Sequence, residues 1–399
     1  MSWPTVFLGD VTERIDYGLT ASAIDNPNGP RFLRITDIQN DSVNWNTVPS
    51  CECSKNDIKD NELQVGDIVF ARTGATTGKS YLIRELSLTA VFASYLIRVR
   101  AKPCIDTLYL SHFFKSGFYW SQINSMANGA AQPGVNSSKL KNLQIPFPPL
   151  EEQKRIAAIL DKADAIRQKR QQAIALADDF LRSVFLDMFV RAADNWTVKT
   201  IDYIADKEKG GLRTGPFGSQ LLHSEFVDSG IPVLGIDNAV ENVFKWGKAR
   251  FITDEKYKSL SRFTVHPEDV LITIMGTCGR CAVVPDDIPT AINTKHLCCI
   301  SLDYKKALPE FLHSYYLFHP ISRQYLAKVT KGAIMDGLNM GLIKAMPFPM
   351  VPIKLQEKYV EIKMNVLSSL DKQHLSESNQ EDLFNSLSQQ FFVGKCLTA

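Results

Sequence analysis

The feature that most constrains the fold of this 399-residue chain is that one pattern is written twice. Residues 32–35 (FLRI) correspond to residues 233–236 (VLGI), and the PFP of residues 146–148 returns at residues 347–349, both 201 positions later. Five further pairs of segments keep the same order, at spacings between 193 and 203 residues. Because the order holds along nearly the whole chain, we infer an internal duplication and predict two similar modules.

Each copy begins with a part that predicts short strands. The runs are rich in β-branched and aromatic residues, and Gly, Pro, Asn or Asp separates them. They lie at residues 63–71, 80–83 and 94–100 in the first copy, and at residues 263–274, 281–284 and 296–302 in the second. A helical stretch follows in each copy, at residues 107–123 and 309–326. Each module is therefore predicted to be α+β, with a strand-rich core and peripheral helices.

The second part of each copy predicts a long helix. No glycine or proline interrupts residues 150–192, and a spacing of four and three residues from Ile156 to Met188 is typical of a coiled-coil seam. A weaker seam runs from Leu355 to Phe391, and residues 373–380 are poor helix formers, so a break there is left open. Amphipathic helices covering a globular core are the alternative, but a helix of about 40 residues exceeds the usual globular length.

Connectivity then predicts how the helices are arranged. The first helix joins the two modules, and the second leaves the second module and has only the first helix as a partner of similar length. We expect an antiparallel two-helix coiled coil that separates two similar strand-rich domains, with pseudo-two-fold symmetry within one chain. Two readers held at a fixed separation suit two half-sites on duplex DNA. Because the loops of the copies differ, the expected target is bipartite and asymmetric.

Composition places limits on this interpretation. The formal net charge is only +2, whereas a DNA-binding domain acting alone usually shows a stronger basic excess. A DNA reader of this composition needs local basic patches, or a partner that supplies phosphate contacts. The start of the chain has no secretory pattern and no run of 18 apolar residues occurs, so a cytoplasmic location and no membrane contact are expected.

Two motifs suggest other chemistry, and both are weak. Residues 74–80 (GATTGKS) resemble a phosphate-binding loop, but one residue is missing and a strand-like run follows where a helix is needed. Cys278 and Cys281 form a C-x-x-C motif that precedes Cys298 and Cys299, a spacing that invites zinc. The first copy has Thr76 and its neighbours in that loop, so the fold does not demand a metal. We predict no metal and no cofactor on this chain.

The candidate DNA-contacting residues lie in corresponding loops of the two copies. Arginine suits guanine, asparagine suits adenine, aspartate suits the cytosine amino group, and cations suit phosphates. The candidates are Arg34, Asp37, Arg72, Thr73, Lys79, Gln132, Asn136, Lys139, Asp237, Asn238, Thr277, Arg280, Lys295, His296, Asn339 and Lys344. For each of them the alternative is structural: a turn, a cap formed by Asp or Asn, or an ordinary surface cation.

Three segments resemble the specificity subunits of type I restriction–modification systems. They are IPFPPLEEQKRIAAILDKADAIR from Ile145 with its echo MPFPMVPIKLQEKYVEI from Met346, GDIVFARTGATTGK from Gly66, and NGAAQPGVNSSKLKNLQIP from Asn128. The resemblance covers nearly the whole chain. It implies target-recognition domains at residues 1–148 and 194–350, with helical spacers at residues 149–193 and 351–399. The second signature lacks the charged EEQKR run, so the surfaces that dock the methyltransferase subunits are not expected to be equally strong.

The resemblance also implies partners. These are double-stranded DNA, two methyltransferase subunits, and restriction–translocase subunits held through them. S-adenosylmethionine, ATP and magnesium are then expected on those partners. No methyltransferase, triad or nuclease pattern stands out in the chain, so no catalytic residue is predicted. The alternative functions are a symmetric, non-catalytic protein–protein scaffold and, far behind, a P-loop enzyme.

Overall fold

The computed structural model describes residues 3–26, 28–39, 41–127, 134–191, 196–330 and 337–393. The chain divides into two compact units. Unit 1 comprises Met1–Gln172 and Gln373–Ala399, and unit 2 comprises Ala173–Lys372. Each unit therefore contains one strand-rich part and a portion of both long helices.

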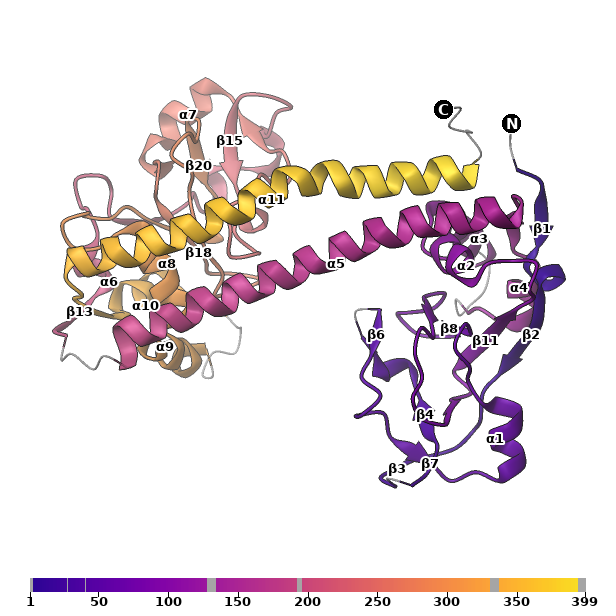
Figure 1. Ribbon diagram of the computed structural model, residues 1–399. Coiled ribbons are helices and arrows are strands. Elements are labelled where there is room, and N and C mark those ends of the chain that lie inside the picture. Colours follow the sequence, from indigo (N-terminus) through magenta and orange to yellow (C-terminus); the bar gives the residue numbers. More distant parts are fainter. Residues whose placement is uncertain are drawn as a thin grey trace. The chain divides into compact units, whose positions relative to one another are not determined.

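Unit 1 is built on an antiparallel sheet in the order β2–β11–β8–β9 (Figure 1). Its strands are β2 (Thr12–Tyr17), β11 (Leu96–Ala101), β8 (Ile68–Ala71) and β9 (Ser80–Leu82). A second sheet, in the order β10–β4–β7–β3, contains a parallel pair formed by β10 and β4. Its strands are β10 (Ala90–Phe92), β4 (Arg31–Leu33), β7 (Ser50–Cys51) and β3 (Ala23–Ile24). Two further pairs join β1 (Thr5–Phe7) to β12 (Gln144–Pro146), and β5 (Ile38–Gln39) to β6 (Ser42–Val43).

Unit 2 repeats the order of the first sheet. Its antiparallel sheet runs β14–β21–β18–β19, formed by β14 (Leu212–Thr214), β21 (Leu297–Ile300), β18 (Val270–Thr273) and β19 (Cys281–Val283). The second sheet runs β16–β15–β20–β17, formed by β16 (Phe251–Ile252), β15 (Ile231–Leu234), β20 (Ala291–Asn293) and β17 (Thr264–Val265). It shares three equivalent strands with the second sheet of unit 1, while the fourth strand, β17 in unit 2 and β3 in unit 1, lies at the opposite edge. β15 and β20 are parallel, as β4 and β10 are, and β13 (Val198–Thr200) pairs with β22 (Pro347–Pro349). Both units mix strands and helices, as predicted.

The central strands are continuous apolar runs because both of their faces are covered. In β8, Ile68 and Phe70 enter the core under the helices, whereas Val69 enters a second core on the opposite face. In β18, Val270 enters one core and Leu271 the other. Strands buried on both faces lose the usual alternation of apolar and polar residues.

Each predicted helical stretch is in fact two helices. The helices of unit 1 are α1 (Lys55–Asn61), α2 (Thr107–Phe113), α3 (Gly117–Ala127) and α4 (Ser137–Lys141); those of unit 2 are α6 (Ile201–Ile204), α7 (Asp254–Leu260), α8 (Pro309–Phe318), α9 (Pro320–Thr330) and α10 (Met340–Ala345). α2 and α3 separate at Ser116, whose hydroxyl accepts a hydrogen bond from Tyr119 N at 3.2 Å. α8 and α9 separate at His319, which is extended because a proline follows it.

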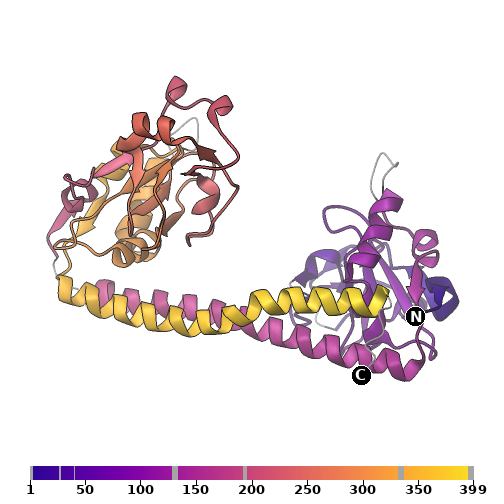
Figure 2. The ribbon, with the colours of Figure 1, turned by 90° about the horizontal axis from the view of Figure 1, so that it is seen from above.

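The long helices match the predicted lengths. α5 (Leu150–Leu186) continues into a π-helical turn, η3 (Asp187–Arg191), and α11 (Ile353–Val393) passes through residues 373–380 without a break. In unit 1 the end of α11 lies on the start of α5, because Phe391 and Phe392 share a buried core with Ile156 (Figures 1 and 2). In unit 2 the start of α11 lies on the end of α5, where the ring centres of Tyr359 and Phe185 are 5.2 Å apart.

A buried glutamine joins each long helix to its own unit. The Oε1 atom of Gln153 accepts a hydrogen bond from Asp106 N at 2.9 Å, and that of Gln356 accepts one from Leu308 N at 2.9 Å. Each Nε2 atom donates to a backbone carbonyl just before its own helix, at 2.8 and 2.7 Å. Both side chains are fully buried and lie 203 positions apart, within the spacing of the repeat. The second signature therefore keeps the buried glutamine but replaces the EEQKR pattern around it with Lys354, Glu357 and Lys358.

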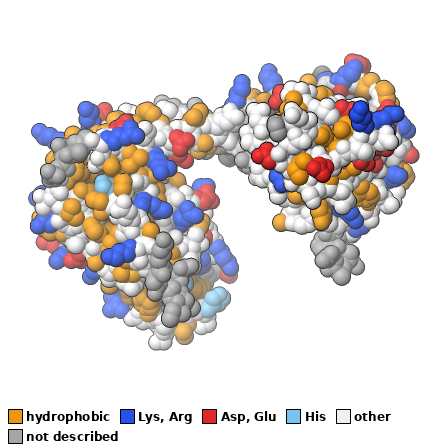
Figure 3. All heavy atoms as spheres, turned by 90° about the horizontal axis from the view of Figure 1, so that it is seen from below, with side chains coloured by type: hydrophobic (Ala, Val, Ile, Leu, Met, Phe, Trp, Pro, Cys, Tyr) orange, Lys and Arg blue, Asp and Glu red, His pale blue; other side chains and the backbone are white. Residues whose placement is uncertain are grey.

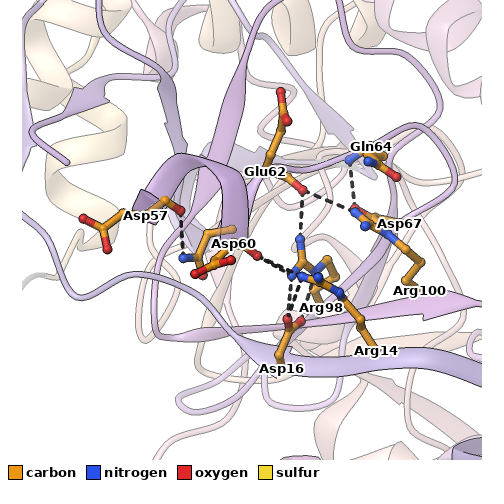
Figure 4. Close-up of polar contacts among 10 residues, drawn as sticks. Arg14, Asp16, Asp57, Asp60, Glu62, Gln64, Asp67, Arg98 and Arg100 are labelled. Carbon is orange, nitrogen blue, oxygen red and sulfur yellow. Dashed lines mark hydrogen bonds and ion pairs between the residues drawn. The ribbon is translucent and has the colours of Figure 1, made fainter. Parts of the chain in front are cut away.

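Unit 1 contains a buried guanidinium, shown in Figure 4. The Arg98 side chain is fully buried, and its Nε and Nη2 atoms donate to the carboxylate of Asp16 at 2.9 and 2.5 Å. Its Nη1 atom donates to Glu62 O at 2.8 Å, and Nη2 also donates to Asp60 O at 3.0 Å. These carbonyls lie around the end of α1. Arg98 therefore ties that helix end to the sheet.

Unit 2 has a related arginine–aspartate pair, but its arginine comes from a different strand. Asp67 and Asp269 occupy matching positions, and each accepts a hydrogen bond from a backbone N–H three residues earlier. Asp67 is held by Arg100 of β11 at 2.7 Å, whereas Asp269 is held by Arg213 of β14 at 2.5 Å. The guanidinium thus comes from a different strand in each unit, although the carboxylate stays in place.

Three cysteines of unit 2 are part of its cores, whereas Cys278 is partly exposed. Cys281, Cys298 and Cys299 are fully buried, and Cys298 and Cys299 enter two different cores. Burial raises the pKa of Cys298 to about 12, so this thiol stays protonated at neutral pH. In the described part of the chain, no three His, Cys, Asp or Glu side chains are grouped so as to hold a metal ion. Within the same ranges no helix is long and apolar enough to span a bilayer.

A buried polar cluster joins α11 to α8 in unit 2. Lys363 Nζ lies 2.5 Å from Glu310 Oε2 and donates to His313 Nδ1 at 3.0 Å. The Nε2 atom of His313 faces the carbonyls of Asn242 and Cys281 at 2.8 and 3.1 Å, so Nε2 carries the proton and the ring is neutral. Burial, and after it the charge of Lys363, lower the pKa of His313 to about 4, against the opposing effect of Glu310.

This histidine makes stability depend on pH. The unfolded imidazole gains a proton near pH 6.5 and the folded one only near pH 4, so between these values the unfolded chain binds more protons. The contribution is fully present above pH 6.5 and is lost as the pH falls towards 4. We expect His313 alone to lower the free energy of unfolding by about 2 kcal/mol between pH 7.5 and pH 5. Chemical denaturation at both pH values measures the free energy of unfolding. We expect it to decrease less between pH 7.5 and pH 5 in His313→Gln than in the wild-type chain. An equal fall in both proteins would contradict the assignment.

Candidate nucleic-acid interface

The turn between β8 and β9 carries three of the predicted DNA contacts. Ala71 N donates to Lys79 O, and Gly78 N donates to Ala71 O, both at 2.9 Å, which closes a tight loop. Arg72, Thr73 and Lys79 are exposed on it. The loop leads into a strand and not into a helix, so it lacks the helix N-terminus that a phosphate-binding loop needs. An exposed turn that presents polar side chains to a ligand fits this geometry better.

Arg72 connects this turn to neighbouring elements. Its guanidinium lies over the ring of Tyr17, 5.0 Å from the ring centre. The Tyr17 hydroxyl accepts a hydrogen bond from Ser137 N at 3.1 Å, which lowers the pKa of Tyr17. The turn and the start of α4 together form an open pocket of about 570 Å³, whose lining includes Arg72, Thr73, Asn136 and Lys139. The structure therefore brings four predicted residues together.

Two of these four residues also have structural roles. Asn136 is the N-cap of α4, where its Oδ1 atom accepts a hydrogen bond from Lys139 N at 2.8 Å. Lys139 Nζ donates to Gly134 O at 2.8 Å and to Met126 O at 3.2 Å. In unit 2, Asn339 caps α10 in the same way. The capping alternative thus accounts for both asparagines. Gln132 lies outside the described residues.

Arg34 and Asp37 bind one another. Asp37 closes the short helix η2 (Ile35–Asp37) by accepting a hydrogen bond from Arg34 N at 2.9 Å. The Arg34 guanidinium donates to the same carboxylate at 3.0 and 2.8 Å, and these bonds raise the pKa of Arg34. Asp37 is nearly buried, whereas 40% of the Arg34 side chain is exposed. Of this pair, Arg34 is the side chain available to a ligand.

A larger pocket of about 820 Å³ in unit 1 joins this region to the turn. Its lining includes Thr36 and Gln39 near Arg34, Thr73 and Lys79 of the turn, and Arg167 of α5. Sequence analysis treated Arg167 only as a position of the helix seam. The four-and-three spacing of α5 gave no indication that Arg167 also lines a pocket beside the turn.

The matching turn of unit 2 is closed by the same bonds. Thr273 N donates to Arg280 O at 2.9 Å, and Gly279 N donates to Thr273 O at 3.0 Å. Thr277 and Arg280 line an open pocket of about 370 Å³ together with Arg323 of α9, which the sequence did not indicate. Lys344 does not line this pocket. Its Nζ atom lies 3.8 Å from Asp202 Oδ1, and both side chains are well exposed.

The remaining candidates follow β15 and β20. Asn238 is buried in the short helix η6 (Ile236–Asn238), where its Oδ1 atom accepts a hydrogen bond from Gly235 N at 2.8 Å. Asp237 is 36% exposed. Burial raises its pKa, but the hydrogen bonds from Arg250 and Lys248 N outweigh burial and lower it. Burial lowers the pKa of His296, and the cations Lys295 and Arg250 lower it further.

The face of the molecule drawn in Figure 3 is of mixed character. Lys and Arg side chains are interspersed there with hydrophobic side chains and with Asp and Glu. This agrees with the formal net charge of +2. Any nucleic-acid contact must therefore depend on local groups of cations and not on a uniformly basic surface.

Comparison with known proteins shows similarity to type I restriction–modification specificity subunits. A model of the type I restriction modification DNA specificity domain matches residues 2–176. The MjaVIII specificity subunit of Methanocaldococcus jannaschii is 21% identical over 315 residues, which cover 74% of this chain and 71% of that protein. The EcoBI specificity subunit of Escherichia coli is 24% identical over 301 residues, which cover 68% and 61%.

A solved structure shares the fold. The crystal structure of a type I restriction–modification S subunit from M. genitalium aligns with 98% of this chain and 96% of that one. The TM-score is 0.61 at 15% sequence identity, a likeness that concerns the fold alone. Residues 2–176 thus match the type I restriction modification DNA specificity domain, and the chain is similar over most of its length to type I specificity subunits.

Proposed function

We propose that this chain is the non-catalytic DNA sequence-specificity subunit of a type I restriction–modification complex. Residues 1–148 and 194–350 each read one half of a bipartite target. The observation that carries this proposal is that both units have the same strand order in their antiparallel sheet and present on it a matching exposed turn that ends in a cation, Lys79 or Arg280. Such a cation suits a phosphate or a guanine edge.

The two half-sites are expected to differ in sequence. Arg72 lies over Tyr17 in unit 1, whereas Ile274 occupies the matching position in unit 2 and receives the corresponding hydrogen bonds. An arginine offers several donors and an isoleucine side chain offers none. Equivalent turns therefore present different hydrogen-bonding groups, which supports an asymmetric target.

The long helices, residues 149–193 and 351–399, act in this proposal as an antiparallel coiled-coil spacer that gives the chain pseudo-two-fold symmetry. Within each unit, opposite ends of α5 and α11 share a core, which supports antiparallel pairing. Every residue of the predicted seam of α5 is at least partly buried. With 37 residues, α5 is roughly 55 Å long, which is enough to fix the separation of two half-sites.

The helices are also proposed to hold the catalytic partners. Leu176 and Phe180 of α5 are 69% and 51% exposed, and exposed apolar side chains on a helix suit a docked protein. Two methyltransferase subunits, with restriction–translocase subunits bound through them, would carry S-adenosylmethionine, ATP and magnesium. The start of α5 also exposes the pairs Glu151–Lys154 and Glu152–Arg155, which the second signature lacks. The two docking surfaces are therefore expected to differ in strength.

A symmetric protein–protein scaffold remains the alternative, and methylation separates the two functions. The purified chain is combined with its methyltransferase partner and a pool of randomised duplex DNA, and the methylated molecules are sequenced. A DNA specificity subunit confines methylation to one split motif with a gap of fixed length. Methylation without sequence preference would favour the scaffold.

A further inference from the structure

Arg34 and Gly235 occupy the same place in the two units. Each follows a strand that pairs in parallel, β4 with β10 and β15 with β20. Each backbone N–H donates to the side chain three residues later, Arg34 N to Asp37 at 2.9 Å and Gly235 N to Asn238 at 2.8 Å. At the position where unit 1 presents its partly exposed guanidinium, unit 2 therefore has no side chain at all.

The guanidinium of Arg250 fills that space in unit 2. A Cβ atom placed on Gly235 would lie 2.4 Å from Arg250 Nη2, so the glycine leaves room for this arginine. Arg250 precedes β16, and its Nη2 atom donates to Asp237 Oδ1 at 2.5 Å. Its Nε atom donates to Val233 O at 3.3 Å, within β15. Both units thus present an arginine–aspartate pair beside the same strand end, but the arginine comes from a different segment of the chain.

Further cations surround this pair in unit 2. The backbone N–H of Lys248 donates to Asp237 Oδ2 at 2.6 Å, and the Lys248 side chain is exposed. Lys295 and His296 follow β20, close enough to Arg250 for its charge to act on the imidazole. Trp246, 58% exposed, belongs to the same segment as Arg250. One carboxylate among several cations leaves a positive site, which favours an acceptor-rich or anionic ligand.

We propose that Arg250 is the unit 2 counterpart of Arg34 and contacts an acceptor of duplex DNA, either a phosphate oxygen or guanine N7 and O6, in the half-site read by unit 2. The inference rests on the proposed function. Asp237 positions the guanidinium by binding Nη2 while Val233 O accepts from Nε, and the 24% of the side chain that is exposed is available to the ligand. Arg250 is absent from the contacts predicted from the sequence, where Asp237, Lys295 and His296 appear without it.

The test measures binding of the complete complex to duplex DNA that carries the motif of the wild-type complex. Arg250→Ala is expected to weaken binding at least about tenfold. A uniform loss across sequences, with a shallower dependence on salt, indicates a phosphate contact, and a relaxed preference at one base pair of the unit 2 half-site indicates a base contact. Either result supports the proposal. The half-site read by unit 1 should keep its preferences.

Lys209→Ala is the matched control, because it removes one exposed cation from the opposite end of β21, where Lys209 O accepts a hydrogen bond from Ser301. The role of Arg250 would be overturned if the Arg250→Ala complex matched the Lys209→Ala complex in affinity, salt dependence and base preference. If the Arg250→Ala variant fails to assemble into the complex, the same DNA-binding measurements are made with Arg250→Lys. The proposal expects this variant to bind or discriminate less well at the unit 2 half-site alone, and wild-type behaviour would contradict it. A wild-type complex without sequence preference instead rejects the proposed function itself.

Discussion

Replacing Arg98 with leucine is expected to lower the free energy of unfolding by about 3–5 kcal/mol. The guanidinium is fully buried and satisfies Asp16 together with the carbonyls of Asp60 and Glu62. Leucine fills part of the volume but removes all four hydrogen bonds of the guanidinium, and it leaves Asp60 O and Glu62 O with the bonds from Arg14 and Arg100 at 3.1 and 3.3 Å. Hydrogen bonds to charged groups contribute about 1.5–3 kcal/mol each. Denaturant unfolding of the variant and of the wild-type chain measures the difference.

Arg14→Ala is the matched control from the same strand pair. Arg14 is 46% exposed, lies 3.9 Å from Asp16 and donates to Asp60 O at 3.1 Å (Figure 4). Exposed ion pairs contribute little, so we expect a loss of less than about 1 kcal/mol. Similar losses in the two variants would contradict the importance given to burial of the Arg98 guanidinium.

Lengthening both long helices is expected to lengthen the gap of the DNA target and leave both half-sites unchanged. Seven residues inserted after Gln172 and seven after Lys372 fall at the boundary between the units and preserve the heptad spacing. They add roughly 10 Å of helix, which corresponds to about three base pairs at ~3.4 Å each. Sequencing of DNA methylated by the assembled complex reads out the gap.

The control is an insertion of the same length after Asp286, in the exposed loop between β19 and β20. It adds the same number of residues without touching either helix, so the gap should keep its wild-type length. An unchanged gap after the helix insertions would remove the spacer role from the proposal. Loss of one half-site after the helix insertions would also count against it, because neither unit's sheets are altered.

The repeat was enough to predict two similar strand-rich parts. Residues 32–35 and 233–236 matched in the sequence, and they contain the ends of β4 and β15, which form equivalent parallel pairs. The lengths of α5 and α11 also followed from the sequence, because a seam without glycine or proline leaves little alternative to a long helix. The unbroken course of α11 did not follow, since the low helix propensity of residues 373–380 left a break open.

The candidate DNA-contacting site was harder to predict, because asparagine can either contact a base or cap a helix. Asn136 and Asn339 were chosen because an amide suits adenine, yet both cap short helices. A short polar side chain before a helix satisfies a free backbone N–H, and the repeat preserves this need in both copies. Repetition of a polar residue therefore indicates shared structure as readily as shared ligand contact.

Arg250 shows a different limit of sequence comparison. At the spacing of the repeat it corresponds to Pro49, so the aligned copies give no reason to associate it with Arg34. Only the three-dimensional structure reveals that its guanidinium fills the space above Gly235. A charge that moves from one segment to another is invisible to a position-by-position comparison. The exchange of Arg100 for Arg213 as partner of the matching aspartates is a second case.

Exchange of a single module tests the central claim most directly. Residues 1–148 are replaced by the corresponding residues of a family member with a known target, and DNA methylated by the assembled complex is sequenced. The account predicts that one half of the split motif changes to that of the donor, while the other half and the gap stay as in the wild type. A change in both halves, or in neither, would contradict the claim that each unit reads its own half-site.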